Sequence, residues 1–186
     1  MMSIEEKWFR RVSGDFLVMR RMVAAYRTLL RTHQQLANKY KAVSDAERYA
    51  IKPAIKAIEE HMDDLARQIS DEAGKRHPAY NKLVKELGIA GNTTAMEALA
   101  EIIIYLDMAK GFRKTANLLG LFKPVRGRKK IYDGRLRQAL QRLTCSVNNI
   151  MGYQLTAKLE KQTLHKVWKT CRQETRGRPA IPAQQG

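Results

Sequence analysis

The chain has 186 residues and a formal net charge of +17, from 35 Lys and Arg against 18 Asp and Glu. Residues 1–104 hold 17 basic and 14 acidic side chains, whereas residues 105–186 hold 18 basic and 4 acidic ones, an imbalance typical of chains that meet phosphates. With only two Cys, a disulfide framework and a zinc site are not expected, and we expect free thiols. No secretory signal is visible, and the longest apolar run, around Ile-Ile-Ile-Tyr-Leu, is too short to span a membrane. We therefore expect a cytoplasmic location.

The first predicted element is a long helix at the N-terminal end. It opens with Ser3-Ile4-Glu5-Glu6, a capping box in which a hydroxyl and a carboxylate satisfy the exposed amides of a helix start. Apolar or aromatic residues then recur at intervals of three and four, at Phe9, Val12, Phe16, Met19, Val23, Tyr26 and Leu30. This spacing predicts an apolar seam along one helix face.

A second long helix follows. Ser44-Asp45-Ala46-Glu47 repeats the capping box, and a second seam runs through Ile51, Ile55, Ile58, Met62, Leu65 and Ile69. Pro53 lies inside this seam, either in the first turn of the helix or at a kink in a longer one. Two such helices fold back as an antiparallel hairpin or pair with a second chain. We expect residues 1–75 to form a coiled-coil-like hairpin for oligomerisation or scaffolding, and a homodimer joined through it.

The remaining predicted elements are short helices. Gly74 and the Arg76-His77-Pro78 corner end the second long helix. Apolar patterns then predict helices over residues 80–87, 93–106, 112–121, 134–150 and 155–168, and no alternating strand pattern is found. The predicted fold class is therefore all-α, with residues 76–172 as a compact basic helical module. Residues 173–186, rich in Pro, Gly and Gln, are expected to be disordered, with Arg176 and Arg178 adding loose phosphate contacts.

A glycine-bounded turn joins the first two of these short helices. Gly88 and Gly91 let the backbone come close to a nucleic-acid strand, and the amides of Asn92, Thr93 and Thr94 open the next helix at the positive end of its dipole. A helix-hairpin-helix grips a DNA phosphate in this way. The alternative is an ordinary helical corner capped by Asn92 or Thr93.

The densest positive charge lies in residues 123–143, with eight Lys or Arg and one acidic residue. Leu136, Leu140 and Leu143 form the core face of a helix there, which leaves the flanking cations for solvent or phosphate. We predict a phosphate clamp whose affinity falls steeply with salt. Its candidate ligands, joined by Arg113 and Lys114 from the preceding helix, are Lys123, Arg126, Arg128, Lys129, Lys130, Arg135, Arg137 and Arg142.

The order of these motifs resembles the C-terminal half of insertion-sequence transposases that combine a RuvC-like domain with a serine-bearing domain and work with a bridge RNA, a group that includes Piv-type DNA invertases. In that family a long helical hairpin leads to a PGIGxxTA-like turn, then a Phe, a GLxP element and a GxxLRxxL helix. The counterparts, within residues 45–150, are GIAGNTTA ending at Ala95, then Phe112, Gly120-Leu121 with Pro124, and GRLRQAL over residues 134–140.

The chain departs from that family at its catalytic residues. No RuvC-like segment is present in this sequence, and no serine follows the GLxP element in VRGRKKIYDG; the serine's role is not carried over to Ser146. The resemblance therefore implies a DNA- or RNA-binding remnant without strand-transfer chemistry.

The sequence favours a non-enzymatic nucleic-acid-binding protein. It has no Walker A, HExxH, paired Ser/His/Asp or DxD motif, and we expect no cofactor and no metal. The predicted function is binding of duplex or branched DNA, mainly through phosphates and with little base specificity, in association with the nucleoid. Two alternatives stay open: a structured-RNA-binding protein, and a helical protein–protein scaffold whose basic half serves solubility or adhesion to a membrane surface.

Overall fold

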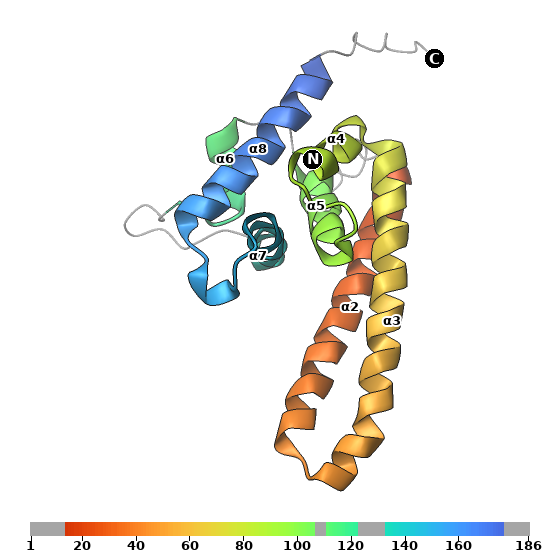
Figure 1. The fold of residues 1–186 in the computed structure, drawn as a ribbon. Coiled ribbons are helices and arrows are strands. Elements are labelled where there is room, and N and C mark those ends of the chain that lie inside the picture. Colours follow the sequence, from red (N-terminus) through yellow and green to blue (C-terminus); the bar gives the residue numbers. More distant parts are fainter. Residues whose placement is uncertain (1–13, 107–110, 123–132, 177–186) are drawn as a thin grey trace, which may run out of the picture. The chain divides into compact units, whose positions relative to one another are not determined.

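The computed structural model describes residues 14–106, 111–122 and 133–176, and every regular element in these ranges is a helix (Figure 1). The predicted all-α class is confirmed. The chain divides into two compact units, residues 1–76 and residues 77–186. Among the helices of the described ranges, none is both long enough and apolar enough to cross a bilayer.

The first unit is an antiparallel hairpin of α2 (Gly14–Ala42) and α3 (Asp45–Arg76), as Figure 1 shows. The Glu47 carboxylate accepts hydrogen bonds from the Ser44 amide at 3.1 Å and the Ser44 hydroxyl at 2.7 Å, and these bonds lower the pKa of Glu47. The carboxylate half of the predicted capping box is therefore present at the start of α3, whereas the Ser44 hydroxyl donates to that carboxylate and does not accept from a helix amide. The first predicted capping box, Ser3–Glu6, lies outside the described residues.

The predicted seams face each other in this hairpin but are covered unevenly. Met19, Val23 and Tyr26 are buried, whereas Ile55 and Ile58, nearer the turn, are half-buried. Two helices alone leave one side of such a seam open to solvent. His33 of α2 pairs with Glu59 of α3, with Nε2 and Oε1 2.9 Å apart. Pro53 lies well inside α3, beyond its first turn.

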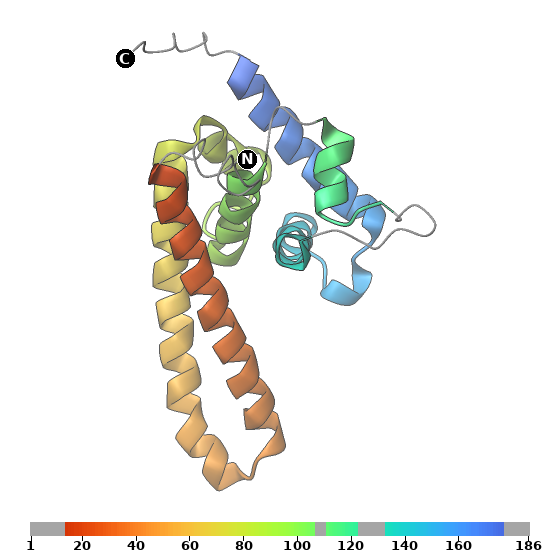
Figure 2. The same ribbon diagram turned by 180° about the vertical axis from the view of Figure 1, so that it is seen from behind.

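The second unit contains α4 (Pro78–Glu86), α5 (Thr93–Tyr105), α6 (Phe112–Leu118), α7 (Gly134–Asn148), the short 3-10 helix η1 (Gly152–Gln154) and α8 (Ala157–Arg176). α5 packs along α7, and α8 contacts α4, α6 and α7 (Figures 1 and 2). These elements begin close to the predicted positions. Their core is formed by side chains that exclude water almost completely, among them Leu83, Leu99, Ile102, Leu140, Leu143, Leu164 and Val167.

The predicted disordered tail begins too early. α8 continues to Arg176, so residues 173–176 are helical rather than disordered. Two contacts with α4 hold this last part of the helix: the Thr170 hydroxyl donates to Glu86 Oε2 at 2.9 Å, and Lys82 Nζ lies 3.0 Å from Glu174 Oε1. The amino-acid composition of residues 173–186 does not indicate these contacts, because the partner residues are on α4. Residues 177–186, including Arg178, lie outside the described residues.

Candidate nucleic-acid interface

The turn between α4 and α5 is built by its two glycines. Gly88, at φ +66°, ends α4, and the Ile89 amide donates back to the Val84 carbonyl at 3.1 Å. Gly91, at φ +81°, follows in a tight turn closed by the Asn92 amide and the Ile89 carbonyl at 3.0 Å. Residues other than glycine rarely adopt such φ angles, so both glycines are needed for the backbone conformation of this turn.

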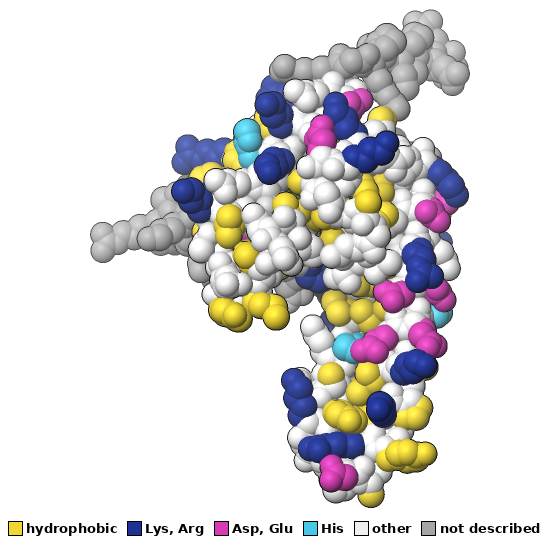
Figure 3. Space-filling model, in the orientation of Figure 1, with side chains coloured by type: hydrophobic (Ala, Val, Ile, Leu, Met, Phe, Trp, Pro, Cys, Tyr) yellow, Lys and Arg dark blue, Asp and Glu magenta, His cyan; other side chains and the backbone are white. Residues whose placement is uncertain are grey.

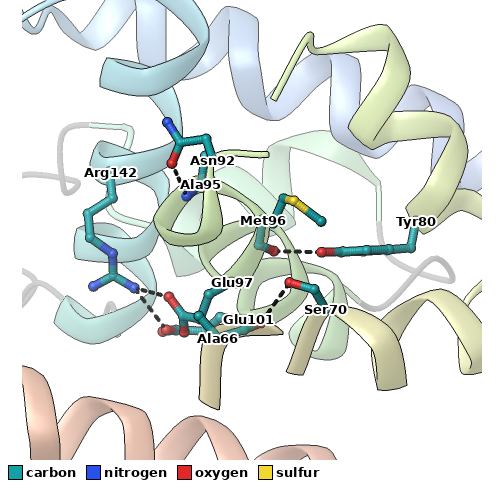
Figure 4. A network of polar contacts seen from close by, with 9 residues as sticks. All are labelled: Ala66, Ser70, Tyr80, Asn92, Ala95, Met96, Glu97, Glu101 and Arg142. Atoms are coloured by element: carbon teal, nitrogen blue, oxygen red, sulfur yellow. Dashed lines mark hydrogen bonds and ion pairs between the residues drawn. The ribbon is translucent and has the colours of Figure 1, made fainter. Parts of the chain in front are cut away.

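The start of α5 is capped by its own chain. Asn92 Oδ1 accepts from the Ala95 amide at 3.0 Å (Figure 4), so of the two candidate capping residues Asn92 is the one that caps this helix. Thr94 is exposed and Thr93 is half-buried in the first turn of α5. The helix-hairpin-helix function of this turn, with Gly88, Gly91, Asn92, Thr93 and Thr94 around a phosphate, stays a prediction.

The predicted clamp divides into three groups. Arg113 and Lys114 on α6 and Arg135 on α7 are exposed, as a phosphate contact requires. The loop cations Lys123, Arg126, Arg128, Lys129 and Lys130 lie outside the described residues. Arg137 and Arg142, in contrast, turn inward.

Arg137 is part of the internal structure, which corrects its assignment to the clamp. Its guanidinium donates to the carbonyls of Leu119 at 3.1 Å and Gly120 at 2.6 Å, and to Glu160 Oε2 of α8 at 2.6 Å. Glu160 is buried, so this cation compensates a carboxylate inside the protein and ties the end of α6 to α7 and α8. These bonds hold the guanidinium toward the interior and use three of its five N–H donors.

Arg142 is also internal, and its assignment to the clamp is wrong for the same reason. Its Nη2 lies 2.8 Å from Glu97 Oε2 and 3.3 Å from Glu101 Oε2 on α5 (Figure 4). Both carboxyl groups have 0% of their side-chain surface exposed, and Arg142 has 20%. Burial, only partly opposed by Arg142, raises the pKa of Glu97 to about 8, and the neighbouring Glu101 acts in the same direction. Burial therefore favours the protonated form of Glu97.

α8 carries a set of cations that the sequence analysis missed. Lys158, Lys161, Lys169 and Arg172 are separated by three, eight and three residues, a spacing that places them on one side of the helix. We call these four residues the α8 stripe. None of them is buried, whereas Leu164, Val167 and Cys171 on the opposite side are fully buried. Figure 3 shows Lys and Arg side chains gathered over α8.

The two carboxylates of α8 are engaged elsewhere. Glu160 pairs with Arg137 of α7, and Glu174 pairs with Lys82 of α4. Within the described residues, neither carboxylate forms an ion pair with Lys158, Lys161 or Lys169. Arg172 lies over the ring of Trp168, with Cζ 4.8 Å from the centroid, and Lys161 Nζ lies 4.5 Å from the ring centroid of Phe122, so both positive ends are held near the helix surface.

Neither cysteine is an activated thiol. Burial raises the pKa of Cys171 to about 12, and it also raises the pKa of Cys145, so both stay protonated at neutral pH. Both are free, as predicted. No group of three or more His, Cys, Asp or Glu side chains in the described ranges is arranged to hold a metal ion. No protein-family model, no curated protein and no solved structure matches this chain.

Proposed function

We propose that this protein binds DNA through the sugar-phosphate backbone, with the α8 stripe as the central contact. The observation that carries the proposal is a row of four cations on the solvent side of α8. The two carboxylates of this helix are paired with cations of other helices. Arg113 and Lys114 extend the positive surface, since α6 packs on α8. A protein with this activity would associate with the nucleoid.

The stripe favours phosphates over base edges. Three of its members are Lys, whose ammonium is a point charge on a long stem and contacts phosphate without reading a base. A helix that enters the major groove presents Arg, Asn or Gln to the base edges, and no such row lies within the stripe. We therefore expect low base specificity and a strong dependence on salt.

The resemblance to bridge-RNA transposases supports an origin of this chain as a non-catalytic, transposase-derived protein. The order of hairpin, glycine turn, α6 and α7 follows the order of motifs in that family. In the sequence as given, neither the family's serine nor its RuvC-like carboxylates have counterparts. We propose no catalytic residue, and strand-transfer activity is not part of the proposal.

Titration of three labelled probes tests the proposal. Duplex DNA, a four-way DNA junction and a hairpin RNA are each titrated at two salt concentrations, and fluorescence anisotropy reports binding. We expect both DNA probes to bind, with a logarithmic slope against salt close to −0.9 per phosphate contacted. Preferential binding of the hairpin RNA would establish the RNA-binding alternative. Absence of binding to every probe at low salt would overturn the proposal in favour of a protein scaffold.

We also propose that the hairpin joins two copies of the chain. Ile51, Ile55 and Ile58 are only half-buried, and a second copy would cover this part of the seam. Light scattering over a range of protein concentrations is expected to give the mass of two chains, and Ile58→Asp is expected to give the mass of one. Exposed Lys52→Asp, on the same helix, is the matched control and should leave the mass unchanged. A single-chain mass for the natural protein at all concentrations would contradict the proposal.

A further inference from the structure

A shallow depression of about 540 Å³ lies on the second unit where α6, α7 and α8 meet. It is lined by Phe112 from α6, Val147 and Asn148 from α7, and Lys161, His165 and Lys166 from α8. The volume falls in the range of sites that hold small organic ligands, about 300–1,000 Å³. Apolar surface, an aromatic wall and two ammonium groups within one site fit a ligand that is both flat and anionic.

The aromatic wall is held in a fixed arrangement. The Phe112 and His165 rings meet edge to face, with centroids 5.1 Å apart, and the His165 ring lies nearly parallel to the Trp168 ring at 6.4 Å. Phe112 also meets Trp168 edge to face at 5.8 Å. Trp168 is almost completely buried, whereas His165 is exposed. The buried indole therefore fixes two rings that solvent reaches, and such rings are platforms for stacking a nucleobase.

Polar groups surround this wall. Lys161 and Lys166 carry positive charge to the site from two neighbouring turns of α8. The Asn148 amide nitrogen donates to the Thr144 carbonyl at 2.8 Å, so the Asn148 carbonyl oxygen is the atom of that amide available to accept from a base. The exposed amide of Gln162, which also lines the depression, can both donate and accept.

We propose that this depression binds one unpaired nucleotide of a bound strand. The base stacks on Phe112 and His165, and Lys161 and Lys166 contact the adjoining phosphates. Because Lys161 also belongs to the α8 stripe, the nucleotide site and the backbone contact adjoin each other. This inference rests on the proposed function and makes it more specific. The protein prefers DNA with a base already out of the stack, because binding to a perfect duplex includes the free-energy cost of unstacking a base.

Two duplexes that differ by one nucleotide test this preference. One is a perfect duplex, and the other has the same sequence with a single unpaired adenine near its centre. Fluorescence anisotropy with the full chain is expected to show at least about fivefold tighter binding of the bulged duplex, from the gain of stacking on an aromatic side chain. Free adenosine monophosphate is added in a competition arm.

Two variants locate the preference in the depression. Phe112→Leu keeps an apolar side chain but removes the ring, and His165→Gln replaces an exposed ring by a polar side chain. Each variant is expected to bind the bulged duplex and the perfect duplex with nearly equal affinity. Exposed His61→Gln, on α3, is the matched control and should keep the ratio of these two affinities of the natural protein. Circular dichroism checks that each variant is folded; should Phe112→Leu unfold, His165→Gln decides.

The outcomes separate this inference from the function on which it rests. Failure to bind either duplex would overturn both. Equal binding of the two duplexes, or a preference that both variants retain, would leave DNA binding in place and overturn the nucleotide site. Displacement of the bulged duplex by micromolar adenosine monophosphate would identify a free nucleotide as the ligand, which overturns the assignment to a bound strand.

Discussion

Replacing Lys158, Lys161 and Lys169 together by Ala is expected to weaken binding to duplex DNA on the order of 10²-fold near 0.1 M salt. Each phosphate contact contributes about 0.9 to the slope of log K against log salt, which is roughly eightfold in affinity for every tenfold dilution of salt. If each of the three ammonium groups contacts one phosphate, the slope decreases by about 3 units. Titration at several salt concentrations measures the affinity and the slope together.

A matched triple variant separates a local contact from a general effect of net charge. Lys39, Lys41 and Lys52 are exposed on α2 and α3, and their replacement by Ala removes the same charge from the chain. We expect the slope of this control to stay within about 1 unit of that of the natural protein. Equal losses in the two triple variants would mean that the protein attracts DNA by its overall charge, without a defined contact on α8.

Replacing Arg142 by Met is expected to lower the free energy of unfolding by about 3–5 kcal/mol. The change leaves Glu97 and Glu101, both completely buried on α5, without the cation that lies 2.8 and 3.3 Å from their oxygens. Removing one partner of a buried pair costs far more than the pair itself contributes, because the remaining groups stay desolvated. Urea denaturation followed by circular dichroism measures the loss.

A companion variant tests this explanation. Replacing Glu97 and Glu101 by Leu together with Arg142→Met removes every ionisable group of this cluster, and we expect it to recover most of the lost stability. A loss below about 1 kcal/mol for Arg142→Met alone, which is what an exposed ion pair contributes, would contradict the internal role of Arg142.

The same cluster predicts how stability depends on pH. The pKa of Glu97 is about 8 in the folded protein, against an ordinary value of 4.5. Between these two values the folded state keeps a proton that the unfolded state has released, so the free energy of unfolding falls as the pH rises from about 4.5 to 8. Glu97→Gln keeps the side chain neutral and should flatten this fall, so that the stability of the variant relative to the natural protein increases as the pH rises through this window. Parallel stability profiles for the two proteins would show that Glu97 does not titrate in this window.

Local signals in the sequence were enough to predict most of the helices. The Ser44–Glu47 box, the Asn92 cap, and the Gly88 turn are each decided by neighbours within about six residues, so sequence shows them directly. The end of α8 was not predictable in this way, because Lys82 and Glu86 of α4 hold it from more than 80 residues away.

The candidate site was harder to predict because charge density and charge exposure are different properties. Arg137 and Arg142 lie in the most basic stretch of the chain yet serve buried carboxylates. One signal was present: Glu97 and Glu101 stand four residues apart in an otherwise apolar helix, and carboxylates so placed require a cation. The α8 stripe was not predicted because buried side chains stand between its members, so that the charge per residue of this stretch is low. The spacing of the four cations, by three and eight residues, is nevertheless visible in the sequence.

Lysine footprinting on the complex with duplex DNA tests the central claim most directly. The free protein and the complex are acetylated briefly, and mass spectrometry compares the extent of modification at each lysine. We predict strong protection of Lys158, Lys161 and Lys169 on α8 and no change at Lys39, Lys41 and Lys52 on the hairpin. Full acetylation of the three α8 lysines in a saturated complex would contradict the claim that this helix holds the phosphate backbone.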